Sequence, residues 1–389
     1  MITYKFRMYP NKEVREKLDL SLDICRQTYN NLLEELNNQA KIDRGKIQHK
    51  IVEMKEEHPE IAQVYSKTLQ YECYRLFSNL SALRELKKRG HKVGRLRFKG
   101  RQWFKTMNYN QSGFTFEQNS KKGLLHLSKI GNIKVKAHRQ VEGNIKQVTL
   151  KKSLGKWYCM LVSDSKNKMK CGKGIVGIDL GINNYVYDSN GNSVAHPMTI
   201  QKYSDELKVA QQNLSRKKKG SNNRYKAKFA VAKLHERIEN TRNDFLHKLS
   251  HRYIAKYKTI VVEDLNIKSM MQSSYNARNM ADASWGKFVQ FLCYKAESAG
   301  GKVEKINPKN TTKQCSNCGN IQHMPLWIRT YDCKNCGMSI DRDYNSAKGI
   351  LRKFLGKGLT YVENNPSAQE TEQGLSMKQE AITSAGAKL

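Results

Sequence analysis

The 389-residue sequence has few apolar residues, and they never form a long run. Apolar residues make up 38% of the chain, whereas ordinary globular proteins have about 45–50%. A membrane-spanning helix needs roughly 18 consecutive apolar residues, and the sequence contains no such run. The first residues also lack the basic, apolar and small-residue order of a signal peptide. We therefore expect a soluble protein of the cytoplasm, without a membrane partner.

Acidic residues are scarce as well. The sequence has 35 Asp and Glu residues and 70 Lys and Arg residues, which leaves a formal net charge of +35. A surface with this excess repels itself unless a polyanion is bound, so the charge predicts a nucleic-acid partner. A ribosome-associated or merely basic protein is the alternative. The 9 cysteines form no dense, even framework, which argues against a disulfide-stapled secreted domain.

The apolar pattern changes several times along the chain. After a short strand-like segment that ends at Pro10, leucines recur every three or four residues, as in an amphipathic helix. Short alternating segments separated by turns then predict an antiparallel barrel or sandwich. Beyond a lysine-rich stretch, strands alternate with helices, which indicates an α/β sheet. The expected units are a β-barrel at 1–10 and 91–168, a helical unit at 11–90, an α/β unit at 169–306 and 338–357, a cysteine-containing insertion at 307–337 and a disordered tail at 358–389.

Two segments concentrate positive charge. Around residues 95–105, basic residues alternate with Phe98, Trp103 and Phe104, which fits a groove where aromatic rings stack on bases. An ordinary β-core with a solvated basic face explains this pattern equally well. In the predicted helices at about 203–257, few acids offset the cations, which favours phosphate contact. The candidate nucleic-acid contacts in these segments are Arg97, Lys99, Arg101, Arg216, Lys217, Lys218 and Arg237.

Four cysteines give the strongest local signal. Cys315 and Cys318 form one Cys-x-x-Cys pair, and Cys333 and Cys336 form a second pair after a short loop. Two such pairs present four thiolates to one tetrahedral zinc ion. A redox role is the alternative, but the paired arrangement favours structural zinc. The remaining cysteines are scattered, mostly among apolar residues, and we expect them to be buried.

Three acidic positions interrupt or end apolar segments. Asp179 lies within the apolar segment 176–181, Glu263 ends the segment 260–263, and Asp341 and Asp343 follow the second cysteine pair at the start of a predicted helix. A carboxylate beside a buried strand costs several kcal/mol unless it is paired or binds a metal. Carboxylates converging from two strands and a helix start would hold two divalent cations about 4 Å apart, as phosphodiester hydrolysis requires. Taken singly, each acid could be a strand-end, turn or helix-cap residue, and Asp341 suits a cap.

Taken in order, these motifs resemble those of the TnpB family, which bacterial insertion sequences encode and which is related to type V CRISPR effectors. The similar segments are Gly177-Ile178-Asp179-Leu180-Gly181, Val262-Glu263-Asp264-Leu265, the two cysteine pairs and Asp341-Arg342-Asp343-Tyr344-Asn345-Ser346-Ala347. Further similar segments lie at 9–10, 25–30, 127–131, 214–221, 242–250 and 285–286. The resemblance extends from about Thr3 to Leu351.

The resemblance implies an RNA-guided DNA endonuclease of a bacterial or archaeal cell. Its fold would be multidomain α+β: an RNase H-like (RuvC) nuclease domain with a zinc-ribbon insertion, an antiparallel β-barrel wedge domain and a helical recognition domain. Asp179, Glu263 and Asp343 would be catalytic and hold two Mg²⁺ ions, with Asp341 supporting or capping, and the four cysteines would hold one Zn²⁺.

The resemblance also implies the partners. These would be a guide RNA from the transposon end and a double-stranded DNA target beside a short recognised motif, in a complex of one protein with one RNA. Gln70 and Tyr109 are candidates for reading that motif.

Three alternatives remain at this point. A compact type V CRISPR effector would use the same chemistry with a repeat-derived guide. An RNA-guided DNA-binding regulator would not cleave, and the complete carboxylate set argues against it. A DNA-joining transposase would need a tyrosine nucleophile, and nothing in the sequence marks one among the 19 tyrosines.

Overall fold

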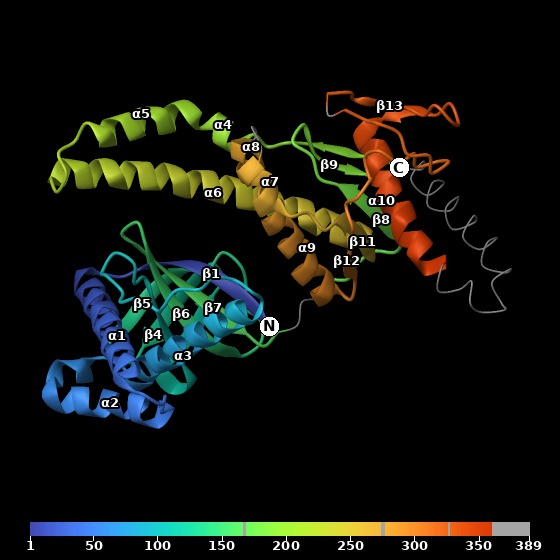
Figure 1. Cartoon of the computed structure of the whole chain (residues 1–389). Helices are drawn as coiled ribbons and strands as arrows, with labels where there is room; N and C mark the ends of the chain where they lie inside the picture. Colours follow the sequence, from blue (N-terminus) through green and yellow to red (C-terminus); the bar gives the residue numbers. More distant parts are fainter. Residues whose placement is uncertain (166–168, 274–276, 326, 360–389) are drawn as a thin grey trace. The chain divides into compact units, whose positions relative to one another are not determined.

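The structure is a computed structural model that describes residues 1–165, 169–273, 277–325 and 327–359. The tail expected at 358–389 lies outside the described residues, except for its first two positions, which end a helix. The chain divides into two compact units, Met1–Asn167 and Lys168–Leu389 (Figure 1). In the described ranges, no helix is long and apolar enough to cross a membrane.

The first unit is built on a seven-stranded sheet in which every neighbouring pair is antiparallel. The strand that comes first in the sequence lies at its centre. The strand order is β2 (Thr106–Asn110), β6 (Ile145–Ser153), β7 (Lys156–Ser163), β1 (Ile2–Tyr9), β5 (Gly131–Lys136), β4 (Lys122–Leu127) and β3 (Phe114–Asn119).

The expected barrel is not closed, because the sheet ends at two edge strands, β2 and β3, with no ladder between them in the described structure. These edges are nevertheless joined in sequence by the three-residue turn Gln111–Gly113. A link this short holds the Cα atoms of Asn110 and Phe114 within about 14 Å of each other. The sheet is therefore strongly curled, and a turn rather than a hydrogen-bonded ladder connects its edges.

Three helices pack with this sheet. They are α1 (Lys12–Asn38), α2 (Arg44–Glu57) and α3 (Ser66–Lys88), with a short 3₁₀ turn at Pro59–Gln63. The side chain of Asn11 caps α1 by accepting a hydrogen bond from the Val14 N–H at 2.9 Å. Buried leucines of α1 and α3 share one hydrophobic core with the inner face of the sheet. The helices and the sheet are thus parts of one packed unit.

The second unit contains a mixed five-stranded sheet. Its order is β10 (Ser193–Ala195), β9 (Asn184–Asp188), β8 (Ile175–Asp179), β11 (Thr259–Glu263) and β12 (Lys302–Ile306). The last three strands are parallel, and β9 and β10 are antiparallel additions. Because the chain must cross over between parallel neighbours, helices cover both faces of this sheet.

The two faces of the second sheet carry different helices. Apolar residues of α6 (Asn222–Lys256) and α9 (Trp285–Ala299) cover one face, and α10 (Arg342–Leu359) covers the other. A small hairpin of β13 (Thr330–Asp332) and β14 (Ser339–Asp341) precedes α10. With α6, α5 (Ser204–Ser215) forms a long hairpin that extends beyond the sheet (Figure 1). Short helices α4 (Thr199–Lys202), α7 (Ile267–Ser273) and α8 (Ala277–Ala283) fill the connections.

Candidate functional site

Two of the candidate carboxylates end neighbouring parallel strands. Asp179 is the last residue of β8 and Glu263 the last of β11, and the register pairs the preceding residues, Ile178 and Val262. Val261, two positions before Glu263, packs with residues of α10. Because side chains alternate along a strand, Glu263 projects to the face that α10 covers, as does Asp179.

Two glycines allow close approaches at β8. Gly177 lets α10 approach the strand, and Gly181 lies in the tight loop that follows the strand. A Cβ atom at Gly177 would lie 2.5 Å from the Ala347 carbonyl oxygen of α10, so only glycine permits this approach. A Cβ at Gly181 would lie 2.7 Å from the Asn184 carbonyl oxygen and 3.9 Å from Asp343 Oδ2. The glycines on either side of Asp179 therefore bring the start of α10 to the ends of the strands.

The two acids at the start of α10 have different tasks. Asp341 Oδ1 accepts hydrogen bonds from the main-chain N–H groups of Asp343 at 2.8 Å and Tyr344 at 3.2 Å. This is an N-terminal cap, so the capping role expected for Asp341 is confirmed. Asp343, in the first turn, is left to face the strand ends.

The other two carboxylates act electrostatically on Asp179. Burial raises the pKa of Asp179 well above its usual range, and the Glu263 and Asp343 carboxylates raise it further, while Arg342 opposes them. Burial also raises the pKa of Glu263, although Thr311 donates a hydrogen bond to it at 2.5 Å and Lys353 lies nearby. A divalent cation would relieve this concentration of buried negative charge.

The ligand oxygens of these acids are not yet gathered as tightly as a metal site requires. Of the His, Cys, Asp and Glu groups in the described ranges, only the four cysteines have ligand atoms all within 4.8 Å of one another. Asp343 instead forms an ion pair with Arg329, which lies between the two cysteine pairs. This contact could not be predicted from the sequence, because nothing in the local pattern distinguishes Arg329 from other surface cations.

The four cysteines form a compact sulfur cluster. Cys315 Sγ lies 3.7 Å from Cys336 Sγ, and Cys318 Sγ lies 3.6 Å from Cys333 Sγ. With Zn–S bonds of about 2.3 Å, the sulfurs of a tetrahedral zinc site are about 3.8 Å apart. Hydrogen bonds, led by one from Asn335, lower the pKa of Cys318 to about 6, which favours the thiolate that binds metal. This cluster could therefore hold Zn²⁺.

The cysteine-containing segment is fixed to the helix that bears Asp343. The buried Asn345 side chain accepts a hydrogen bond from the Ser316 N–H and donates one to the Gln314 carbonyl, both at 2.9 Å. About two turns further along α10, Arg352 Nη1 donates to the Asn317 carbonyl at 2.8 Å. Hence the cysteine cluster and the carboxylate site share one supporting helix.

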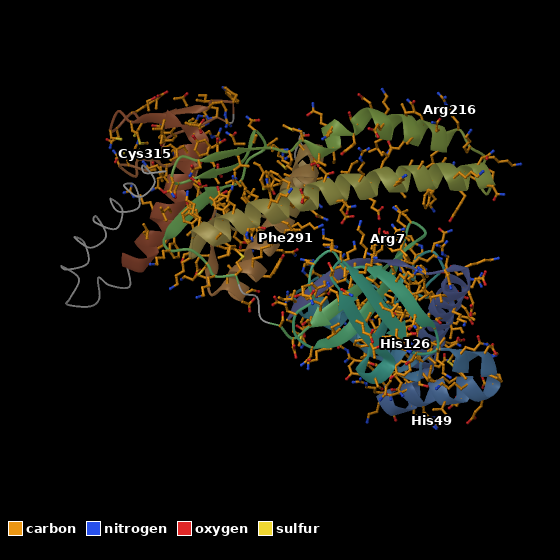
Figure 2. All side chains as sticks on the ribbon, turned by 180° about the vertical axis from the view of Figure 1, so that it is seen from behind. Arg7, His49, His126, Arg216, Phe291 and Cys315 are labelled. Carbon is orange, nitrogen blue, oxygen red and sulfur yellow. The ribbon has the colours of Figure 1, made fainter. Side chains whose placement is uncertain are left out.

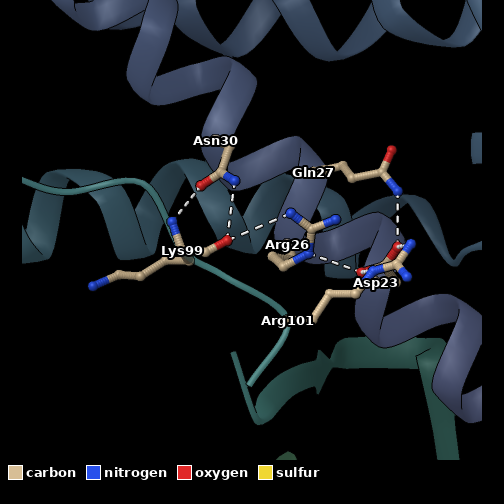
Figure 3. A network of polar contacts seen from close by, with 6 residues as sticks. All are labelled: Asp23, Arg26, Gln27, Asn30, Lys99 and Arg101. Carbon is tan, nitrogen blue, oxygen red and sulfur yellow. Dashed lines mark hydrogen bonds and ion pairs between the residues drawn. The ribbon is translucent and has the colours of Figure 1, made fainter. Parts of the chain in front are cut away.

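The basic segment at 95–105 is an extended strap held against α1 by its main chain (Figure 3). Asn30 accepts a hydrogen bond from the Lys99 N–H at 2.7 Å and donates one to the Lys99 carbonyl at 3.1 Å. Arg101 forms an ion pair with Asp23 at 3.3 Å. Phe98 and Trp103 remain 58% and 83% exposed and stay available for stacking, whereas Phe104 is buried in the core of the first unit, so the expectation that it stacks on bases is corrected.

The other candidate contacts lie in different environments. Arg97 is exposed on the strap, and Gln70 is exposed on α3. Arg216, Lys217 and Lys218 are exposed where α5 ends, at the tip of the hairpin (Figure 2). Arg237 of α6 lies 3.7 Å from a Glu206 carboxylate oxygen.

Tyr109 does not fit the role of a base reader. Its side chain is fully buried, its ring stacks on that of Tyr65 at 5.7 Å, and its hydroxyl donates to the Ser128 carbonyl at 3.3 Å. Burial also raises the pKa of this hydroxyl. We therefore correct this expectation: Tyr109 belongs to the core of the first unit.

Three family profiles match the sequence. The OrfB_IS605 family, described as a probable transposase, matches residues 157–274, and a Cas12f1-like TNB domain matches residues 285–350. A helix-turn-helix domain matches residues 1–45. In the structure, residues 1–45 contain β1, α1 and the first residues of α2, and β1 is the central strand of the first sheet.

Relatives match over nearly the whole chain. A protein of Streptomyces pristinaespiralis is 30% identical over 97% of this chain and 95% of its own length. InsQ of Escherichia coli K12 is 27% identical over 94% of this chain and 96% of its own length. Both carry the name "Putative RNA-guided DNA endonuclease". The fold resembles that of the protein in the cryo-EM structure of a Cas12f1–sgRNA–target DNA complex, with a TM-score of 0.57, 15% identity and coverage of 87% of this chain and 83% of that one. The chain belongs to the OrfB_IS605 family of TnpB-like proteins.

Proposed function

We propose that this protein is an RNA-guided DNA endonuclease of an insertion sequence, acting in the cytoplasm of a bacterial or archaeal cell. The observation that carries the proposal is the convergence of Asp179, Glu263 and Asp343 at one end of a mixed sheet. The likeness to relatives named as RNA-guided DNA endonucleases supports it. The second unit would then be a RuvC-like nuclease domain, and residues 307–337 a zinc ribbon.

The three carboxylates fit Mg²⁺, because hard oxygen donors are the ligands that this ion prefers. Two bound Mg²⁺ ions would activate the attacking water and stabilise the leaving oxygen. Around this site, Thr311 orients the Glu263 carboxylate through its hydroxyl. Arg342 is 95% buried, and its positive charge opposes the rise in the pKa of Asp179.

The basic surfaces account for the proposed nucleic-acid partners. A guide RNA from the transposon end would be held through phosphate charge, and pairing between guide and target would supply sequence specificity. The exposed strap and the tip of the α5–α6 hairpin carry most of the candidate contacts described above. We propose a complex of one protein with one RNA, and Gln70 remains a candidate for reading the short motif beside the DNA target.

A compact type V CRISPR effector is the second candidate, favoured by the Cas12f1-like profile and by the fold of the Cas12f1 chain. Its chemistry would be the same, but its guide would derive from a repeat array. The origin of the bound RNA distinguishes the two.

The proposed function is tested by purifying the protein with its native RNA and sequencing that RNA. We expect a single transposon-end RNA species, and cleavage of a plasmid carrying the matching target in Mg²⁺. A repeat-derived RNA would favour the CRISPR alternative. Absent or random RNA would contradict a guided nuclease, and target binding without strand breaks would indicate a regulator.

The Arg329–Asp343 ion pair leads to a prediction about metal affinity. Because the guanidinium occupies a carboxylate that the cation needs, Arg329→Ala should tighten Mn²⁺ binding roughly tenfold, as expected for removal of one charged hydrogen bond. Electron paramagnetic resonance titration of the protein without nucleic acid measures this affinity. Lys334→Ala removes an exposed charge from the same segment and should leave the affinity unchanged. Equal affinity in Arg329→Ala and wild type would show that the pair does not compete with metal.

A further inference from the structure

Two tyrosine rings border the three carboxylates of the second unit. The register places Tyr187 of β9 opposite Asp179 of β8, so both side chains lie on the face of the sheet that α10 covers. Tyr344 directly follows Asp343 in the first turn of α10. The rings of Tyr187 and Tyr344 stack on each other, with 5.6 Å between their centres and 28° between their planes. We call these two residues the tyrosine pair.

The tyrosine pair lies among acids rather than in the core. Burial raises the pKa of Tyr187, and the nearby Asp341 and Asp343 carboxylates raise it further. Asp341 also fixes the backbone of Tyr344, because its Oδ1 accepts the Tyr344 N–H at 3.2 Å. Among the described residues, neither ring belongs to the hydrophobic clusters that join the second sheet to its helices. Packing of the core therefore does not account for two aromatic rings at this place.

Part of the tyrosine pair is open to solvent. Both side chains are only half-buried. Gly191, in the turn between β9 and β10, faces Tyr344, and a Cβ atom there would lie 3.7 Å from Tyr344 Cζ and 3.8 Å from its hydroxyl oxygen. Gly191 has a φ of +86°, a conformation that favours glycine. No side chain at this position therefore covers the hydroxyl edge of the Tyr344 ring.

A cation adjoins the tyrosine pair. Lys348 follows Tyr344 by one turn of α10, and its Nζ lies 5.4 Å from the centre of the Tyr344 ring. The Lys348 side chain is half-buried, and within the described ranges it forms no ion pair with a carboxylate. Its ammonium is thus available to an anion from outside the protein. Aromatic rings beside a cation are suited to a nucleotide, whose base stacks on a ring while its phosphate pairs with the cation.

We propose that the tyrosine pair and Lys348 form a subsite for one unpaired nucleotide of the DNA strand that is cut, next to the phosphate at the three carboxylates. The proposal rests on the proposed function and names a contact that pairing with a guide does not supply. The base stacks on the exposed part of the tyrosine pair, and Lys348, on its flexible stem, turns from the Tyr344 ring to the adjoining phosphate. A base inside a duplex is already stacked between its neighbours, so the subsite accepts only an unpaired nucleotide.

The test combines a variant with a changed substrate. With the native RNA bound and target DNA at saturation, Tyr344→Leu should cut about tenfold more slowly, as expected for the loss of one base–aromatic stack. Tyr344→Phe keeps the ring and should cut at nearly the wild-type rate. An abasic nucleotide beside the cut phosphate should slow wild type to the same extent but should not slow Tyr344→Leu any further. A scan of abasic positions along the cut strand locates this nucleotide.

Binding supplies readouts that do not depend on cleavage. The affinity for the whole target should be unchanged in Tyr344→Leu, because pairing with the guide extends over about 20 base pairs. With Ca²⁺ in place of Mg²⁺, so that the strand stays intact, wild type should quench 2-aminopurine at the located position more than Tyr344→Leu does. Lys348→Ala should slow cleavage and make its rate less dependent on salt. This exposed substitution decides the question if Tyr344→Leu does not fold.

A matched control is Tyr294→Leu, which removes a ring that is 47% exposed on α9, the helix on the other face of the sheet. It should cut at the wild-type rate. Cleavage by Tyr344→Leu at the wild-type rate, or an abasic effect that adds in full to that of the variant, would overturn the subsite and leave the proposed function intact. Equal losses in Tyr344→Phe and Tyr344→Leu would also overturn it. If wild type with its RNA cut no target, the proposed function would fail, and the subsite with it.

Discussion

Asp179→Ala should abolish RNA-guided plasmid cleavage, with a loss of more than about 100-fold. Removing a group that merely hydrogen-bonds to a metal ligand lowers metal affinity or activity by about 10–100-fold. Asp179 is proposed to be a ligand itself, so its loss should have a larger effect. Its position between Glu263 and Asp343 makes it the carboxylate most affected by the other two. The rate of linearisation of a target plasmid in Mg²⁺, with guide RNA at saturation, measures the effect.

The stability of the metal-free protein supplies an independent readout for this site. Because its surroundings raise the pKa of Asp179, ionised Asp179 is less favourable in the folded than in the unfolded protein at neutral pH. Asp179→Asn should therefore raise the melting temperature while cleavage is lost. The control is Asp264→Ala, an exposed acid beside Glu263 that forms an ion pair with Lys305. Cleavage by Asp179→Ala at the wild-type rate would refute the assignment of the metal site.

Loss of the cysteine cluster should have an equally large effect on cleavage, but not on RNA binding. Structural zinc supplies about 10–16 kcal/mol to the folding of small zinc domains, and the cysteine-containing segment has only a small core around Cys315, Met324, Tyr331 and Cys333. Cys315→Ser with Cys333→Ser should therefore unfold this segment. The contacts of this segment with Asn345 and Arg352, which support α10 and Asp343, would be lost with it, so cleavage should fall more than 100-fold, comparable to loss of Asp179 itself.

Three measurements define this second prediction. Elemental analysis should find one zinc per wild-type chain and none in the double variant. Hydrogen exchange should rise across residues 314–341 and remain protected in the first unit, which has its own core. Cys293→Ser, at an exposed cysteine on α9, should behave as wild type. Two disulfide bonds in place of zinc would favour the redox alternative.

Helices and strands could be predicted from the sequence where a local apolar pattern belongs to an element with a buried face. The predicted helices at about 203–257 correspond to α5 and α6, and the apolar segment 260–263 lies in β11. Asp179 and Glu263 could be selected because an acid at the end of an apolar strand is costly. The two acids come close together because β8 and β11 are parallel neighbours. Parallel pairing was indicated by the alternation of strands and helices in the sequence.

Contacts between distant segments could not be predicted in this way. β2 consists of Thr106-Met107-Asn108-Tyr109-Asn110, which is too polar to show a strand pattern, so nothing local marked Tyr109 as a core residue rather than the candidate motif reader that the resemblance implied. It is buried because the strand packs beneath Tyr65 and α3. The ion pair of Arg329 with Asp343 depends on how the cysteine segment folds back on α10.

The place of α10 in the chain has a consequence for synthesis. This helix follows every other described element, yet it supplies Asp343 and supports the cysteine segment through Asn345 and Arg352. During translation, the first unit and all five strands of the second sheet emerge from the ribosome before it. A nascent or prematurely terminated chain therefore acquires the basic surfaces of the first unit early and the Asp343 carboxylate last.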